Sequence, residues 1–187
     1  LMQNGNNEKG INQSKLACEK STFSRVEALN YLVHIYLKYE NKAPLALNHL
    51  KSVVAKYPGN MFFTARLAET YLSLDSVQSS QKNIFKLLQC PNPFFVMAGN
   101  VCQARIYDKQ HKWLDARKHA LAALNYFNHN KQEVENYKGF IYQTLAHVAI
   151  AEGNHKQARI YYQSINPATE YPSVAKEARE YLQKTQK

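Results

Sequence analysis

Apolar residues recur every three or four positions along most of the chain, which is the spacing of one face of an α-helix. The first such segment begins near Ser21 and breaks at Asn41, and its apolar positions are Ala28, Leu29, Leu32, Val33, Ile35, Tyr36 and Leu37. A second segment begins at Pro44, a residue favoured in the first turn of a helix, and ends at the turn Pro58-Gly59. The sequence has no sustained alternation of apolar and polar residues, so we expect no β-strands.

The same two-helix pattern returns three more times, with turn residues between the helices. The four helix pairs span about 21–58, 61–91, 94–127 and 137–166. A single closing helix over 172–185 has one polar face and one apolar face, the latter made of Val174, Ala178, Tyr181 and Leu182. Residues 1–20 form a polar lead-in that is helical at most in part. The sequence therefore predicts an all-α protein with a single repeat-built domain over 21–187.

Small and aromatic residues recur at fixed positions within these pairs. The first helices contain, in order, Leu29…Leu32-Val33…Tyr36, Leu67-Ala68…Tyr71, Gln103-Ala104…Tyr107 and Tyr142…Leu145-Ala146…Ala149. The second helices contain Ala46…Leu50…Pro58, Ser80…Ile84…Pro91, Ala116…Ala120 and Ala158…Tyr162…Pro167. The tyrosines of the first three pairs are 35 and 36 residues apart, and the small residues that open the second series are 34, 36 and 42 apart. A small side chain at such a position lets two helices approach closely.

This order of large, small and aromatic positions, at a period of about 34 residues, resembles the tetratricopeptide repeat. The resemblance covers the chain from about Ser21 to Ile165, although Gln103 and Ala149 stand where the repeat prefers Leu and Tyr. It implies a right-handed superhelix of about four helix pairs, closed by the last helix as a polar-backed cap.

The resemblance also implies that the first helix of each pair lines a concave groove, in which a protein or peptide binds. Carried over by position, the groove residues form a mixed and slightly basic set: Asn30, His34, Lys38, Glu69, Arg105, Lys109, Gln143 and His147. We expect one row of equivalent positions in successive repeats, made of His34, Glu69, Arg105 and His147. The alternative is that Glu69 and Arg105 pair only with each other. The subclass that clamps a chaperone's C-terminal carboxylate needs two cations where this chain has Ala98 and Cys102.

The net charge of +10, from 24 basic and 14 acidic residues, raises the question of an anionic partner. The excess is spread evenly: residues 1–104 and 105–187 each net +5, and the longest basic run is the pair Arg117-Lys118. A dedicated phosphate-binding arm usually concentrates its charge. We therefore expect a non-enzymatic scaffold that binds a protein or peptide, with a nucleic-acid-binding or regulatory helical-repeat protein as the alternative. The wealth of Asn, Lys and Tyr is typical of proteins from low-GC bacteria.

The sequence offers little for catalysis or metal binding. Its seven histidines form no HxxxH or HxH pair, and neither a Gly-rich phosphate loop nor a GxSxG elbow occurs. Cys18, Cys90 and Cys102 are odd in number and lack CxxC spacing, so we expect free thiols, with a Cys90–Cys102 pair on consecutive packed helices as the alternative. No apolar run reaches the roughly 18 residues of a membrane span. We therefore expect no catalytic residue, cofactor or metal. No signal-peptide-like segment follows Leu1, and this absence does not decide between a cytoplasmic and a cell-envelope location, so both stay open.

Overall fold

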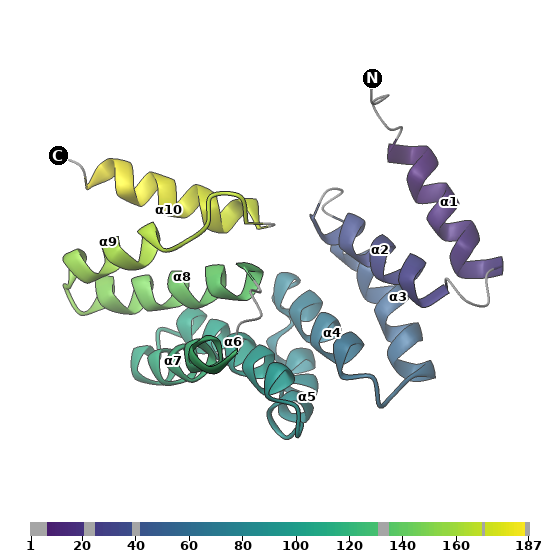
Figure 1. Ribbon diagram of the computed structural model, residues 1–187, viewed down its shortest axis with the longest axis horizontal. Helices are drawn as coiled ribbons and strands as arrows, with labels where there is room; N and C mark the ends of the chain where they lie inside the picture. The colour runs from purple at the N-terminus through teal and green to yellow at the C-terminus, as the bar shows by residue number, and fades with distance from the viewer. Residues whose placement is uncertain (1–6, 21–24, 39–41, 131–134, 170, 186–187) are drawn as a thin grey trace. The chain divides into compact units, whose positions relative to one another are not determined.

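A computed structural model describes residues 7–20, 25–38, 42–130, 135–169 and 171–185, and all regular structure in these ranges is helical (Figure 1). The helices are α1 (Asn7–Lys20), α2 (Arg25–Lys38), α3 (Ala43–Lys56), α4 (Met61–Ser73), α5 (Val77–Leu88), α6 (Pro93–Lys109), α7 (Trp113–His129), α8 (Glu135–Ala151), α9 (His155–Gln163) and α10 (Pro172–Lys184). The all-α prediction is thus confirmed for the described residues. The polar lead-in contributes a full helix, α1, which packs against α2.

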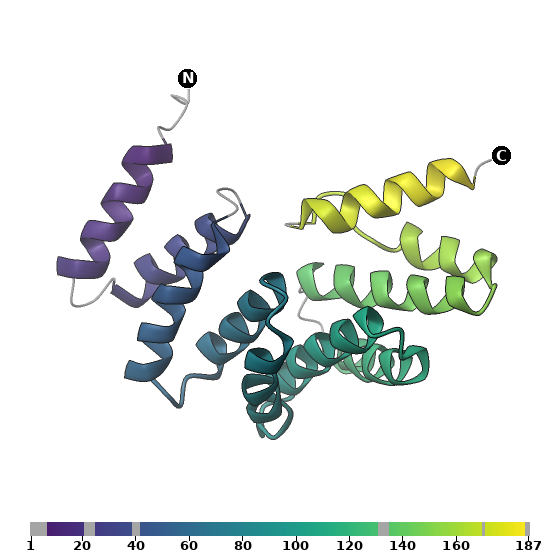
Figure 2. The same cartoon turned by 180° about the vertical axis from the view of Figure 1, so that it is seen from behind.

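The chain divides into two compact units, Leu1–Asp75 and Ser76–Lys187. In the first unit each helix packs against the next, so that α1 contacts α2, α2 contacts α3 and α3 contacts α4. Figure 2, which views the molecule from behind, shows α2 lying against α3. The core of this unit is built from Leu32, Val33, Tyr36, Ala46, Leu50, Phe63 and Leu67. Ala46 is fully buried, as a position of close helix approach requires.

Asparagine side chains define where three helices begin. The Oδ1 atom of Asn60 accepts a hydrogen bond from the Phe62 N–H at 3.0 Å, just before α4. In the same way, Asn92 accepts from the Phe94 N–H at 2.9 Å before α6. Asn154 accepts from the Gln157 N–H at 3.0 Å before α9. Each cap satisfies an amide that has no partner inside its helix, a contribution of about 1 kcal/mol per helix.

Three turns share one backbone geometry, with a residue in the left-handed region directly before the next helix's N-cap. These residues are Asp75 (φ 55°), His111 (φ 56°) and Gly153 (φ 75°), which are 36 and 42 residues apart. Each donates its N–H to the carbonyl three residues earlier, on Leu72, Asp108 and Ile150. The two spacings equal those between the small residues Ser80, Ala116 and Ala158, so the repeat seen in the sequence recurs in the backbone.

In the second unit α8 contacts both α6 and α10, and we call α6, α8 and α10 the row of this unit. α6 contacts α5, α7 and α8, and α8 contacts α6, α7, α9 and α10. Figure 1 shows α8, α9 and α10 side by side. Alanines provide the close approaches, because Ala104, Ala120, Ala123, Ala146 and Ala178 are all buried in this core. At Gly99 of α6, an added Cβ would lie 3.1 Å from the side chains of Leu87 and Leu88 on α5. Neighbouring helices therefore pack in chain order, an arrangement compatible with a helical repeat.

Candidate functional site

His147 of α8 lies between two carboxylates from neighbouring helices. Its Nδ1 atom is 2.8 Å from Oδ2 of Asp108 on α6, and its Nε2 atom is 2.6 Å from Oε1 of Glu177 on α10. A carboxylate oxygen accepts a hydrogen bond, so both ring nitrogens donate and the ring is an imidazolium. The Asp108–His147–Glu177 chain thereby connects three helices that follow one another in the row.

Glu177 is the meeting point of a larger group of polar side chains. The Tyr162 hydroxyl of α9 donates to Oε1 of Glu177 at 2.6 Å, and Nε2 of Gln143 on α8 donates to Oε2 at 2.7 Å. With the His147 bond, three donors converge on one carboxylate. We call this group, formed by Asp108, Gln143, His147, Tyr162 and Glu177, the Glu177 cluster.

The surroundings of each group fix its charge at neutral pH. Burial alone would lower the pKa of His147, but its hydrogen bonds to Asp108 and Glu177 and their negative charges outweigh this and raise the pKa to about 10. Burial would raise the pKa of Glu177, but the hydrogen bonds from His147 and Tyr162 lower it below its usual value. Burial and the bond to Glu177 both raise the pKa of Tyr162. The cluster therefore holds a cationic His147, an anionic Glu177 and a neutral Tyr162.

A second set of side-chain contacts links α6, α8 and the residue before α10. The Arg105 guanidinium of α6 lies over the Phe140 ring of α8, with Cζ 3.9 Å from the ring centroid. The Phe140 ring in turn packs on Tyr171, the residue before α10, at a centroid separation of 4.4 Å. Arg105 and Asp108 are one turn apart on α6, and Phe140, Gln143 and His147 follow one stripe of α8. We call the surface made by Arg105, Asp108, Gln143, His147 and Glu177 the α6–α8 face.

The α6–α8 face is fixed in place yet remains in contact with solvent. The side chains of His147 and Glu177 are 29% and 38% exposed to solvent, respectively. Both nitrogens of His147 are engaged, so in this arrangement the ring has no lone pair with which to act as a general base. What the arrangement provides is a set of charged and hydrogen-bonding groups in fixed positions.

Four of the eight groove residues predicted from the sequence lie in the second unit. Gln143 and His147 are brought together by Glu177, and Arg105 lies on the same face, stacked on Phe140. Lys109 is exposed in the last turn of α6.

The other four predicted residues lie in the first unit. Glu69 of α4 is only 5% exposed and accepts a hydrogen bond from Arg66, one turn earlier on the same helix, at 3.3 Å. His34 is half-buried on α2. Asn30 and Lys38 belong to the same helix, but their side chains lie outside the described part of the chain. The expected row of His34, Glu69, Arg105 and His147 spans both units and stays a prediction.

Sequence reasoning missed Asp108, Tyr162 and Glu177. The sequence pattern places Tyr162 at a repeat position and singles out neither Asp108 nor Glu177. The contacts of His147 with Asp108 and Glu177 join residues 39 and 30 positions apart. The one available signal was the single Glu next to the buried Ala178 in α10, where a carboxylate at the edge of the apolar face needs partners.

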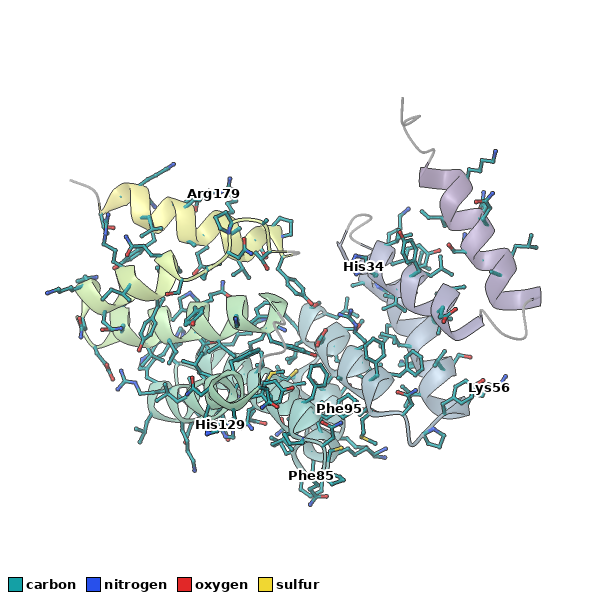
Figure 3. The ribbon with its side chains drawn as sticks, in the orientation of Figure 1. His34, Lys56, Phe85, Phe95, His129 and Arg179 are labelled. Atoms are coloured by element: carbon teal, nitrogen blue, oxygen red, sulfur yellow. The ribbon has the colours of Figure 1, made fainter. Side chains whose placement is uncertain are left out.

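A separate hollow of about 420 Å³ lies where α6 begins and α7 ends. It is lined by Pro91, Pro93, Val96, Met97, Asn100, Ala122, Asn125, Tyr126, His129 and Asn130. Figure 3 labels one of these residues, His129, on α7. None of the predicted groove residues lines this hollow, so it is distinct from the α6–α8 face.

The described residues also bear on metal binding, on the cysteines and on membrane insertion. Among the described residues no group of three or more His, Cys, Asp or Glu side chains is placed to hold a metal ion. Cys90 is half-buried and Cys102 buried, both as free thiols, while the side chain of Cys18 lies outside the described part. No described helix combines the length and apolar character needed to cross a membrane.

Comparison with known proteins gave no match to a family model, to a curated protein or to a solved structure.

Proposed function

We propose that this chain is a non-enzymatic binding module for a protein or peptide, built as a tetratricopeptide-like helical repeat. The observation that carries the proposal is the α6–α8 face, where polar and charged side chains are tied together across helices and stay partly exposed. Its residues come from the first helix of successive pairs and from the closing helix. This is where a groove of such a repeat binds its ligand.

Preorganisation supports a role in binding. Binding a ligand with flexible side chains costs about 0.5–1.5 kcal/mol for each side chain that is immobilised. On the α6–α8 face, Gln143 and His147 are already held by Glu177, and Arg105 is held by Phe140. A partner that meets these groups therefore has less ordering entropy to overcome.

The repeat architecture itself rests on two matching periods. The small residues of the second helices and the left-handed turn residues share the spacings of 36 and 42. Stacked repeats of this kind present an extended surface, on which affinity comes from many modest contacts and a few dominant ones. In such a surface, Arg105 is the natural dominant contact, because Arg is enriched among residues that dominate binding energy.

The experiment that tests the proposal is affinity capture from the source organism's lysate, followed by binding measurements with the captured protein. Arg105→Ala should weaken the affinity more than about fivefold. Arg179→Ala is the matched control, since Arg179 is exposed on α10 outside the α6–α8 face (Figure 3). Equal effects of the two variants, or the absence of any captured protein under several conditions, would contradict the proposal.

A nucleic-acid role is the alternative outcome of the same work. The charge of +10 motivates it, but Arg105 stacks on a ring, Arg117 pairs with Glu152 and Arg66 pairs with Glu69. Submicromolar binding of duplex or single-stranded probes at low salt, steeply weakened by added salt, would replace the protein-binding proposal.

A further inference from the structure

Three hydrogen-bond donors of α8 and α9 converge on a single carboxylate. Nε2 of His147 and the hydroxyl of Tyr162 both lie 2.6 Å from Oε1 of Glu177, and Nε2 of Gln143 lies 2.7 Å from Oε2. Both oxygens are therefore engaged, and one of the donors is a cation. Charge-assisted hydrogen bonds of this length are among the strongest that proteins form with carboxylates.

The donors belong to the repeat, whereas the carboxylate comes from the closing helix. Asp108 binds the opposite nitrogen of His147, so the imidazolium keeps one carboxylate partner and its orientation when Glu177 is absent. The Tyr162 ring packs against Tyr181 at a centroid separation of 4.7 Å, which holds its hydroxyl in position independently of Glu177. His147 and Tyr162 are therefore held in position by contacts other than those with Glu177.

Glu177 itself can leave without α10 moving. The helix is anchored by the buried side chains of Val174, Ala175 and Ala178, which are at most 4% exposed. The Glu177 side chain retains 38% of its exposure, and it reaches the cluster through a flexible stem from a helix whose polar side faces solvent. A change of rotamer is sufficient to return its carboxylate to water.

We propose that Gln143, His147 and Tyr162 form a receptor for an acidic side chain of a partner protein, and that Glu177 is its intramolecular occupant, which the partner displaces. This inference rests on the proposed function and specifies the ligand chemistry for the same face. It uses none of the positions of the chaperone-type clamp, where this chain lacks the cations. While Glu177 fills the receptor, the partner's carboxylate cannot bind there, so the apparent affinity for the partner falls in proportion to the fraction of molecules whose receptor is empty. Removal of Glu177 therefore tightens binding.

The probe for the test is a tetraglutamate peptide, acetylated at its N-terminus and amidated at its C-terminus, titrated at fixed ionic strength. Glu177→Ala should bind it at least tenfold more tightly than the native chain. Glu180→Ala removes the same charge from the same helix at a site where the carboxylate pairs with Lys176, and this variant should bind like the native chain. Equal tightening in both variants would reduce the effect to general electrostatics and overturn the proposal.

Two further arms identify the receptor and the type of carboxylate. Adding Tyr162→Phe or Gln143→Ala to Glu177→Ala should reverse most of the gain, since each removes one donor. A tetraglutamine peptide with a free C-terminus should bind at least tenfold more weakly than tetraglutamate. Stronger binding of that peptide would show that the receptor takes a chain terminus and would overturn the assignment to an acidic side chain.

The native chain provides a readout that does not depend on the folding of a variant. Titration with tetraglutamate should shift the ring NMR signals of His147 and leave those of His119 on α7 unchanged. Unchanged His147 signals at saturating peptide would overturn the proposal. If a captured partner binds the α6–α8 face but leaves these signals unchanged, this inference fails while the proposed function stands. If no partner is captured but tetraglutamate shifts the His147 signals, the carboxylate receptor stands and its assignment to a partner protein fails together with the proposed function.

Discussion

Asp108 and His147 are 39 residues apart in the chain and are joined by a hydrogen bond of 2.8 Å between Oδ2 and Nδ1, which ties α6 to α8. The same ring binds Glu177 through its other nitrogen, so one side chain connects three helices. The apolar contacts that otherwise join neighbouring helices are non-directional. A bond between fixed polar atoms also sets the register of the helices.

Removal of His147 should destabilise the second unit. His147→Ala leaves two half-buried carboxylates facing each other without the cation that lies between them, at an expected loss of about 1–3 kcal/mol in the free energy of unfolding. Chemical denaturation measures this loss. His129→Ala on the exposed end of α7 is the control and should change stability by less than about 0.5 kcal/mol. Equal losses in the two variants would show that the cluster adds no stability.

The stabilising effect of His147 should depend on pH in a defined direction. Its pKa is about 10 in the folded chain against 6.5 for an unperturbed histidine, so folding favours the protonated ring. The resulting stability is fully present below about pH 6.5 and is lost as the pH rises toward 10. The melting temperatures of the native chain and of His147→Gln should therefore converge between pH 7 and 10. A difference that stays constant over this range would contradict the assignment of an imidazolium.

Glu177 should produce the opposite dependence at acid pH. The pKa of its carboxyl lies below 4.5 in the folded chain, so its contribution is present above that value and is lost as the pH falls through the lowered pKa. The melting temperature of Glu177→Gln should approach that of the native chain as the pH is lowered from 5 to below 3. Glu180→Gln, on the exposed side of α10, is the control for the loss of one carboxylate from this helix.

Overpacking should be costly at the small positions of the repeat. Ala104 is 1% exposed within the core formed by α6, α7 and α8, so Ala104→Leu should destabilise by about 1–3 kcal/mol. Ala122→Leu on the exposed side of α7 provides the same change of size without burial, and thermal unfolding compares the two. An unchanged melting temperature for Ala104→Leu would place this residue outside a close helix contact.

The left-handed turn residues offer a test of the repeated backbone. Gly153 has a φ of 75°, a conformation that costs an L-residue with a Cβ about 1 kcal/mol or more. Gly153→Ala should therefore lower stability by about that amount, although no atom lies within 4 Å of the added Cβ. Gly59→Ala, which also meets no atom within 4 Å, should be close to neutral because that residue has no positive φ. Calorimetric unfolding of both variants measures the difference.

Much of the architecture followed from the sequence because helices and their breaks are local features. Apolar residues at helical spacing and turn residues act within a few positions of each other, and they located the helix pairs. The Glu177 cluster is different in kind. Asp108, Tyr162 and Glu177 come from three helices, and only the packing of those helices brings their side chains to His147. The sequence singled out Gln143 and His147 by their repeat positions, but it did not single out Glu177, their common acceptor.

The most direct test of the binding proposal is amide hydrogen exchange of the native chain, alone and with its captured partner. If the α6–α8 face is the binding surface, protection should increase in the parts of α6 and α8 around Arg105 and His147. The exposed end of α7 around His129 should exchange at an unchanged rate. Protection confined to α5, α7 and α9, with α6 and α8 unaffected, would contradict the account.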